Sequence, residues 1–587
     1  MPKVIGISAY YHDSACCLLR DGQLTAAVQE ERFSRRKHDA SLPKQGFYYC
    51  LREGGLTASD IDCVAYYENP YKKLNRQISM MLPDLSQEMA VQFWRNEKRP
   101  IREIREVLGY DGRIEILDHH YSHAASSFFF SGFPEAAILT VDGVGEWATT
   151  TYGYGQGKDI RIFEEVSFPN SIGLLYSSIT EYLGFGINDG EFKVMGLAPY
   201  GTPKYTNKIR KLIHSQSNGQ YALDLNYFDF RNRNRMHTEA LTDLLGQPPR
   251  ARESMISTFH KDLARSLQVV LEEILIDKAK YLFSKTGSEN LCLAGGVAMN
   301  CVANSQILNQ GPFKRLFVQP AAGDAGACVG AAAVAHSRLT GERPSPIKLD
   351  QVYLGPSYSS NEIASLIAKL GLVAMDYRAN ENELLMAAVD RLAGNKVIGW
   401  FQGRMEFGPR SLGARSILAD PRDSNMRDRI NRLVKKREGF RPFAPSILGD
   451  KAHLHFDIDH PSPFMIEVFQ VTSSLSLPAI THVDNSARVH TVSDATNPRF
   501  ARLLSAFEQK TACPILLNTS FNMRDEPIVC SPLDALLCFA RSEIDSLVIE
   551  DFIIDRAGLG RWTELCEALP FNAIEPTSMS DRVYTLF

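Results

Sequence analysis

The chain has 587 residues, several times the roughly 100–200 residues of a typical domain, so we expect more than one hydrophobic core. Hydrophobic residues make up 44% of it and charged residues 22%, which excludes disordered, collagen-like and coiled-coil chains. The 64 basic and 68 acidic side chains leave a formal charge of −4, so the protein as a whole lacks the positive field that holds nucleic acid or an anionic membrane.

The cysteines and the N-terminus indicate a reducing compartment. The 11 cysteines include no C-x-x-C pair, which argues against both a disulfide framework and a zinc knuckle. Residues 1–9 lack the basic and apolar segments of a secretory signal, and no stretch approaches the roughly 18 apolar residues of a spanning helix. We therefore expect a cytoplasmic protein with no membrane partner.

Two stretches, residues 4–28 and 137–163, share a pattern of strand, small polar loop, strand, tight turn and strand. This weak repeat suggests two related α/β lobes that face each other across a cleft, each offering backbone N–H groups and an Asp to something bound between them. Two unrelated hairpins are the alternative.

The remaining pattern predicts a long helix, a glycine turn, a linker and a second α/β domain. The helix covers Met255–Ser284, and a strand at Leu291–Ala294 ends in the paired Gly295 and Gly296. A small-residue helix ends near His336, and the proline-rich, charged segment Thr340–Pro346 is the linker. The domains are thus 1–343 and 350–587. In the second, we expect helices near Asn361–Leu370 and Asn380–Ala393, and strands at Lys396–Phe401, Cys513–Leu517 and Ser546–Ile553.

A histidine pair indicates a metal site. If a helix begins at Asp118 or His119, the side chains of His119 and His123 project from one face about 5–6 Å apart and can chelate one divalent metal. Asp142, in the second polar loop, and Asp324, in a later glycine turn, would complete two imidazoles and two carboxylates. This ligand set suits iron(II), manganese or zinc. The alternative is a helix cap or pairing with Asp118, and His120 should face away.

Two residues near the first polar loop are candidates for chemistry. His12, beside Asp13, could act as general base on an attacking hydroxyl or orient a departing group. Lys37 could bring positive charge to the same cleft, although basic runs are often solvated surface.

An arginine-rich stretch marks the second domain. From Gly399 to Phe443 there are nine Arg and two Lys against five acidic residues, punctuated by glycine and proline. One guanidinium group can bind two oxygens of a phosphate or carboxylate at the same time. Rigid loops that carry several such groups therefore indicate a binding site for a small polyanion such as ATP or a phosphorylated metabolite. Nucleic acid is the rival, but stacking aromatics are sparse. Arg488 and the segment Leu516–Asn522 could complete that pocket.

The ordered motifs of this chain resemble the O-carbamoyltransferases of the NodU/CmcH/TobZ type over essentially its whole length. The motifs that carry the resemblance are Tyr11–Ala15, Gln29–Phe33, His119–Ala124, Asp142-Gly143, Gly190–Gly201, Gly295–Asn304, Phe407–Gly413, Arg437–Pro445 and Asn518–Asn522. The resemblance implies an α/β protein with an actin-like (ASKHA) TsaD-like N-terminal domain, built from duplicated RNase H-like lobes, and a YrdC-like C-terminal domain.

The resemblance also implies an activity. In that family the YrdC-like domain releases carbamate from carbamoyl phosphate and joins it to ATP as carbamoyladenylate, and the first domain passes the carbamoyl group to a hydroxyl. By motif position, the residues that would grip carbamoyl phosphate and ATP are Arg410, Lys435, Arg441, Arg488 and Asn518. Those that look like iron ligands are His119, His123, Asp142 and Asp324. Those that would carry the adenylate are Gly295, Gly296, Asn300 and Asn304, and those next to the carbamoyl group are His12 and Lys37.

The implied cofactors are Fe(II) or another divalent metal, with ATP and carbamoyl phosphate as co-substrates and Mg²⁺ as a further candidate. The implied partner is a small hydroxylated acceptor, with no nucleic acid, and a homodimer is compatible with the sequence. The segments Tyr67–Pro100 and Pro203–Arg252 match no acceptor pattern. Three rivals stay open: threonylcarbamoylation of tRNA, a sugar or acetate kinase, and a metal- and nucleotide-regulated binding protein.

Overall fold

The computed structural model describes residues 2–81, 98–231, 235–344 and 348–560. They form two compact units. Of the described residues, unit 1 contains those up to Ser34 and those within His38–Leu349, and unit 2 contains Arg35–Lys37 and residues 350–560. The expected domain boundary lay between residues 343 and 350. Some of the predicted segments lie partly outside the described residues. They are the expected linker (residues 345–347), the expected second domain (561–587) and the two segments with no assigned acceptor pattern (82–97 and 232–234).

Unit 1 contains a first five-stranded sheet in the order β3-β2-β1-β4-β5. Its strands are β1 (Lys3–Ser8), β2 (Ala15–Arg20), β3 (Gln23–Gln29), β4 (Cys63–Tyr66) and β5 (Arg113–Ile116). The first three are antiparallel neighbours, while β4 runs parallel to β1 and β5 parallel to β4.

A second five-stranded sheet repeats this topology in the order β8-β7-β6-β11-β12. Its strands are β6 (Glu135–Val141), β7 (Ala148–Gln156), β8 (Asp159–Ser167), β11 (Asn290–Ala294) and β12 (Arg315–Val318). Again three antiparallel strands are followed by two parallel ones. The predicted α/β class and the two related lobes are therefore confirmed.

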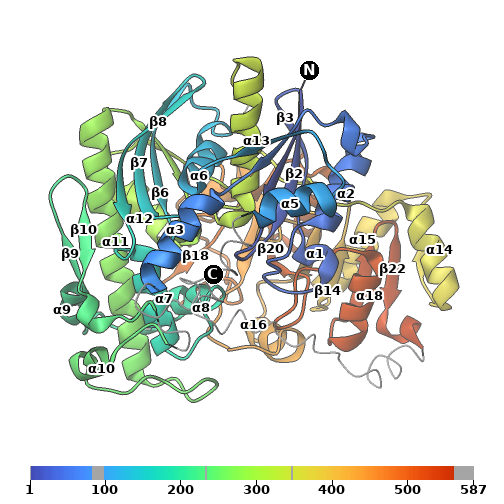
Figure 1. The fold of residues 1–587 in the computed structure, drawn as a ribbon. Coiled ribbons are helices and arrows are strands. Elements are labelled where there is room, and N and C mark those ends of the chain that lie inside the picture. The colour runs from blue at the N-terminus through green and yellow to red at the C-terminus, as the bar shows by residue number, and fades with distance from the viewer. Residues whose placement is uncertain (1, 82–97, 232–234, 345–347, 561–587) are drawn as a thin grey trace. The chain divides into compact units, whose positions relative to one another are not determined.

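Helices α6 (His119–Phe128) and α13 (Asp324–Thr340) pack against each other, α13 against β1 and β2 and α6 against β6 and β11. Figure 1 shows the second sheet between α6 and the long α11 (Thr258–Thr286). The small residues of α13 allow the close approach of α6: a Cβ on Gly330 would lie 1.8 Å from the carbonyl oxygen of Ser122. The two lobes thus meet through a tight helix pair.

The other helices of unit 1 cover the sheets and their connections. They are α1 (Glu31–Ser34), α2 (Lys44–Gly54), α3 (Pro70–Met81), α5 (Arg99–Glu106), α7 (Ile172–Tyr182), α8 (Gly190–Leu197), α9 (Thr206–Ile209), α10 (Glu239–Leu245) and α12 (Cys301–Gln310). The strands β9 (Ile213–Ser215) and β10 (Tyr221–Leu223) form a separate two-stranded antiparallel sheet.

Unit 2 is built on an eight-stranded mixed sheet in the order β13-β22-β21-β14-β15-β20-β16-β19. Its strands are β13 (Met375–Asp376), β14 (Ile398–Phe401), β15 (Arg415–Ala419), β16 (Ala444–Leu448), β19 (His490–Val492), β20 (Ile515–Ser520), β21 (Ser546–Ile549) and β22 (Phe552–Asp555), with β17 (Phe469–Gln470) and β18 (Ser486–Ala487) as a separate pair. Its helices are α14 (Ser360–Leu370), α15 (Glu381–Ala393), α16 (Met426–Arg429), α17 (Pro498–Thr511) and α18 (Pro532–Arg541). Trp400 is fully buried in its core.

The predicted elements lie close to the observed ones, with one correction. The segment Ser546–Ile553, predicted as a strand, is the hairpin of β21 and β22. The reversal occurs at Glu550, whose φ of 44° is left-handed and whose carboxylate accepts the N–H of Gly403 at 2.6 Å. The adjacent acidic residues Glu550 and Asp551 interrupt the apolar run, and Asp is one of the residues that favour turns, so this pair was the available sign of the reversal.

Candidate functional site

Helix α6 places two predicted ligands on one face. His119 is its first residue and His123 follows one turn later, so their Nε2 atoms lie 3.1 Å apart in a fully buried position. His120 faces elsewhere, and its Nδ1 lies 2.6 Å from Oγ1 of Thr140. The alternative pairing is not observed, because the Asp118 carboxylate accepts a hydrogen bond from Lys72 and makes no side-chain cap.

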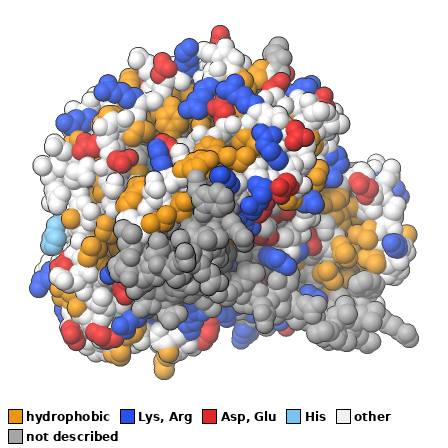
Figure 2. Space-filling model, viewed as in Figure 1, with side chains coloured by type: hydrophobic (Ala, Val, Ile, Leu, Met, Phe, Trp, Pro, Cys, Tyr) orange, Lys and Arg blue, Asp and Glu red, His pale blue; other side chains and the backbone are white. Residues whose placement is uncertain are grey.

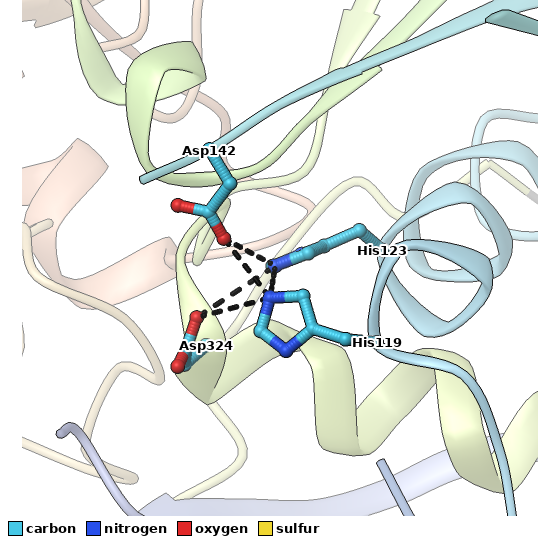
Figure 3. Close-up of side chains that lie close together, drawn as sticks. All are labelled: His119, His123, Asp142 and Asp324. Atoms are coloured by element: carbon cyan, nitrogen blue, oxygen red, sulfur yellow. Dashed lines mark hydrogen bonds and ion pairs between the residues drawn. The ribbon is translucent and has the colours of Figure 1, made fainter. Parts of the chain in front are cut away.

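Two carboxylates from the second lobe and from α13 meet this histidine pair (Figure 3). Asp142 follows β6, and its Oδ2 lies 3.0 Å from Nε2 of His119 and 3.1 Å from Nε2 of His123. Asp324 begins α13, and its Oδ1 lies 3.7 Å from the same two nitrogens. One donor atom from each of the four buried residues lies within 4.8 Å of the others.

The electrostatics of this cluster fit a divalent cation. Burial alone would raise the pKa of Asp142, but hydrogen bonds from the two imidazoles hold it well below its usual range. Burial lowers the pKa of His119, and the negative charge of Asp324 and the hydrogen bond to Asp142 raise it to about 9. At a distance of 3.1 Å, two Nε2 lone pairs repel each other unless at least one nitrogen carries a proton. A divalent cation between them would instead accept the lone pairs of both imidazoles. The donor set of two nitrogens and two oxygens suits iron(II), manganese or zinc.

A pocket of about 770 Å³, counting its open mouth, adjoins this cluster. Its lining includes the predicted residues His12, Asp142, Gly296 and Asn300. It also includes residues that our site prediction missed: Tyr176, Glu191, Phe192, Met195 and Leu271. The motif Gly190–Gly201 contains three of these and was the available signal. The pocket therefore joins the cluster of His119, His123, Asp142 and Asp324 to an apolar wall with the flat, hydrophobic character that a nucleobase ring would fit.

The turn after β11 forms one edge of the pocket. Gly295 has a φ of 97°, and a Cβ there would lie 2.3 Å from the carbonyl oxygen of Val141. The N–H of Gly296 donates to Oδ1 of Asp142 at 3.1 Å. Asn300 caps α12 by accepting the N–H of Ala303, while the fully buried Asn304 donates to the carbonyl of Ala298 and braces the turn from behind.

We expect Gly295→Ala to destabilise this turn and to weaken nucleotide binding at least tenfold, because the added methyl group meets both backbone strain and a clash. Gly287→Ala is the matched control. Gly287 also has a positive φ, of 64°, but nothing lies within 4 Å of its Cβ position, so this change should cost only about 1–2 kcal/mol of stability and leave binding intact. Thermal melts measure the change in stability, and calorimetric titration with AMP measures binding of the adenylate moiety at this turn. Equal binding by the two variants would contradict the role of the turn.

The two residues predicted for chemistry fall in different units. His12 lines the pocket of unit 1, and its Nδ1 lies 3.0 Å from Oδ2 of Asp13. Burial lowers the pKa of His12, but Asp324, Asp13 and Asp142 raise it to about 9, and a cation held by Asp142 and Asp324 would weaken that effect. Lys37 belongs to unit 2, so its role beside His12 stays a prediction.

In unit 2, strand β20 brings two predicted residues together. Asn518 is 1% exposed and donates to the carbonyl of Ser411 at 3.2 Å and to Oγ of Ser446 at 3.0 Å. Lys435 donates to Oγ of Ser520 at 3.0 Å and to Oδ1 of Asn522 at 2.6 Å. Burial, with the charges of Arg437 and Arg441, holds the pKa of Lys435 well below its usual range. A buried lysine of this kind is well placed to gain from an incoming anion.

The predicted arginines differ in their surroundings. Arg441 lies 3.8 Å from the carboxylate of Glu438, and Arg410 lies half-buried in the loop before β15. Within the described part of the chain, the buried Nε of Arg488 has no hydrogen-bond partner. An unpaired buried guanidinium nitrogen is costly, so a bound anion would stabilise it.

Part of the arginine-rich stretch is structural, which corrects the prediction that it gathers around a polyanion. Arg415 is fully buried, stacks over Phe401 and donates to the carbonyls of Gln402 and Pro356. Arg422 forms an ion pair with Asp420 at 2.6 Å, and Arg429 one with Asp545 at 2.8 Å. The local composition did not distinguish these structural arginines from arginines that bind a ligand. Their partners include backbone carbonyl groups and an acidic residue that is distant in sequence.

A buried histidine next to Asn518 gives unit 2 a pH-dependent stability. His490 contacts Ser446, the partner of Asn518, at 2.8 Å, and burial lowers its pKa to about 3. The unfolded chain binds this proton near pH 6.5, so the free energy of unfolding falls as pH drops from about 6.5 toward 3, by at most about 1.4 kcal/mol per pH unit. We expect the stability difference between wild type and His490→Gln to shrink as pH falls, measured by denaturant unfolding from pH 7 to 5. A constant difference would contradict this.

Most of the chain is similar to known protein families and to individual known proteins. A family model for the carbamoyltransferase N-terminus matches residues 3–333, and one for the carbamoyltransferase C-terminus matches residues 389–556. The chain is 39% identical to nodulation protein NolNO of Sinorhizobium fredii, over 96% of this chain and 82% of that protein. It is 36% identical to 3'-hydroxymethylcephem-O-carbamoyltransferase of Amycolatopsis lactamdurans, over 46% of this chain and 49% of that protein. The chain is also similar in fold to the solved structure of T. kodakarensis HypF. The superposed region covers 58% of this chain and 48% of the HypF chain, with 13% sequence identity and a TM-score of 0.32.

Proposed function

The chain belongs to the carbamoyltransferase family, and we propose that it makes carbamoyladenylate from carbamoyl phosphate and ATP and then passes the carbamoyl group to a hydroxyl of a small molecule, such as a secondary metabolite. The enzyme is an O-carbamoyltransferase. The name of the cephem relative describes transfer to the oxygen of a hydroxymethyl group, which supports a hydroxyl acceptor. We assign unit 1 an actin-like, TsaD-like role and unit 2 a YrdC-like role.

The proposed reaction has two stages. In unit 2, water cleaves carbamoyl phosphate into carbamate and inorganic phosphate, and a carbamate oxygen then bonds to the α-phosphorus of ATP as pyrophosphate leaves. Arg410, Lys435, Arg441, Arg488 and Asn518 would hold these anions. In unit 1, the acceptor hydroxyl oxygen bonds to the carbamoyl carbon and AMP leaves. The apolar wall of the pocket and the Gly295–Asn304 turn would hold the adenylate there.

The observation that carries this proposal is that Asp142 belongs to both the ligand cluster and the pocket. Its Oδ2 contacts both histidines, while its Oδ1 accepts the N–H of Gly296 in the nucleotide-binding turn. A phosphate in the pocket therefore lies next to the cluster. A divalent cation held by His119, His123, Asp142 and Asp324 would supply Lewis-acid stabilisation to phosphate oxygens. We propose iron(II) there, with manganese and zinc as alternatives.

The test measures the two stages separately. Wild type should release pyrophosphate from ATP only when carbamoyl phosphate is present, and should release AMP when small hydroxylated acceptors are added. AMP release with tRNA and threonine, but with no small acceptor, would favour the tRNA-modifying rival. Labelled γ-phosphate on an acceptor would favour a kinase. Tight ATP binding without pyrophosphate release under any condition would favour a binding protein.

The remaining predictions concern the surroundings of the enzyme. On the face drawn in Figure 2, basic and acidic side chains are interspersed, which supports a small-molecule acceptor over tRNA. None of the helices within the described ranges is long and apolar enough to cross a bilayer. The cytoplasmic location and the homodimer stay proposals.

A further inference from the structure

The pocket-lining His12 is one end of a chain of three polar side chains. Its Nδ1 lies 3.0 Å from Oδ2 of Asp13, and Oδ1 of the same carboxylate lies 2.8 Å from Nδ1 of His38. One carboxylate thus lies between two imidazoles. The sequence predicts a chemical role for His12 and none for His38, and Asp13 enters that prediction only as the neighbour of His12.

The backbone holds this chain in place. Asp13 and His38 have φ values of 54° and 56°, in the left-handed region that residues with side chains rarely adopt. Their loops are joined by a hydrogen bond of 2.9 Å from the N–H of Ser14 to the carbonyl of Asp39. The N–H of His38 also donates to the buried carboxylate of Glu31 at 2.8 Å. Strain that is retained and braced from several sides indicates a functional constraint.

The charges in this chain decide which nitrogen of His12 carries the proton. Burial alone would raise the pKa of Asp13, but His38 and His12 hold it well below its usual range, so the carboxylate is ionised. An ionised carboxylate only accepts hydrogen bonds, so Nδ1 of a neutral His12 is the donor. A cation held by Asp142 and Asp324 would lower the raised pKa of His12 and so favour its neutral form. In that form the lone pair of His12 lies on Nε2, the nitrogen that Asp13 does not contact.

We propose that Asp13 and His38 are positioning residues for carbamoyl transfer, which fix His12 in the Nδ1–H tautomer so that Nε2 acts as the general base. This rests on the proposed function. In the step, Nε2 takes the proton of the acceptor hydroxyl, the hydroxyl oxygen bonds to the carbamoyl carbon, and the bond from that carbon to the adenylate oxygen breaks, with AMP keeping the electron pair. Asp13 stabilises the imidazolium without taking the proton, and His38 stops the carboxylate from rotating away.

The first test compares Asp13→Asn with wild type. We expect kcat for transfer to fall by about 10²–10⁴, as when the carboxylate of a catalytic triad is replaced by an amide, with KM for the acceptor and pyrophosphate release little changed. Selective ¹⁵N-histidine labelling, assigned with His12→Gln, should show His12 protonated at Nδ1 in wild type and a shift toward the other tautomer in Asp13→Asn. This spectrum needs no substrate.

The second test separates positioning from folding. His38→Gln keeps an N–H donor and should retain more transfer activity than His38→Leu, for which we expect a loss of about 10- to 100-fold, the usual cost of removing an outer orienting group. Asp459→Asn is the matched control, because Asp459 lies 2.6 Å from Nδ1 of His460 in unit 2 and is exposed. It should change neither transfer nor the signals of His12.

Three results would overturn the proposal: wild-type kcat in Asp13→Asn, an unchanged His12 tautomer in that variant, or equal losses in His38→Gln and His38→Leu. Absence of any carbamoylated product with wild type would instead refute the proposed function. In that case the nitrogen spectrum still decides whether Asp13 sets the tautomer.

Discussion

His123→Ala should lose bound metal and carbamoyl transfer while it still makes carbamoyladenylate. The side chain is fully buried, and its Nε2 lies 3.1 Å from both Nε2 of His119 and Oδ2 of Asp142, so its loss removes one of four donors that the fold cannot replace. We expect metal content near zero and transfer reduced by about 10³-fold or more, since metal stabilisation of developing charge is worth several kcal/mol. Pyrophosphate release should persist, because it is assigned to unit 2. Elemental analysis and separate assays of the two stages measure this.

His120→Ala is the matched control for this variant. His120 is on the same helix and is also buried, but its Nδ1 lies 2.6 Å from Oγ1 of Thr140 and it is not one of the four residues whose ligand atoms converge. If collapse of α6 were the cause of metal loss, both variants would lose metal. Unchanged metal content and transfer in His123→Ala would show that the cluster is not the metal site.

Arg441→Ala should have the opposite effect and abolish adenylate formation. Its guanidinium lies 3.8 Å from the carboxylate of Glu438, which is longer than a hydrogen bond, so it can reach an incoming phosphate or carbamate. Loss of one donor that stabilises charge at a reaction centre typically lowers the rate by about 10²–10³-fold. Metal content, and transfer from chemically supplied carbamoyladenylate, should be unchanged. Pyrophosphate release measures the first stage directly.

Arg378→Ala controls for the loss of an arginine in the same unit. Arg378 forms a 2.6 Å ion pair with exposed Asp376, so its removal should leave both stages intact. If Arg441→Ala lost transfer while adenylate was still made, the assignment of the two stages to the two units would be wrong.

The structure brings His119, His123, Asp142 and Asp324 together as predicted, and that convergence was predicted from local patterns. The spacing of His119 and His123 depends only on helix geometry, and the place of Asp142 follows from a strand and loop repeated in the chain. The apolar wall of the pocket was missed because Tyr176, Phe192 and Leu271 come from three separate helices, α7, α8 and α11, which meet only in the tertiary fold.

The roles of individual charged residues were harder to predict from the sequence. Arg415 lies in a stretch whose composition resembles a phosphate-binding loop, yet its two terminal guanidinium nitrogens donate to carbonyl groups such as that of Pro356, 59 residues away. Likewise, the contact between Asp13 and His38 joins residues 25 apart through two strained loops. Such pairings depend on the tertiary fold and leave no periodic trace in the chain.

The most direct test of the account follows the carbamoyl group itself. Wild type is incubated with ATP, ¹³C-labelled carbamoyl phosphate and a panel of small hydroxylated compounds, and the products are separated by mass spectrometry. We predict that one or more acceptors gain a labelled carbamoyl group on oxygen, with one AMP and one pyrophosphate formed per transfer. Label that stays in carbamoyl phosphate or free carbamate with every acceptor, while ATP is cleaved to ADP, would contradict the central claim.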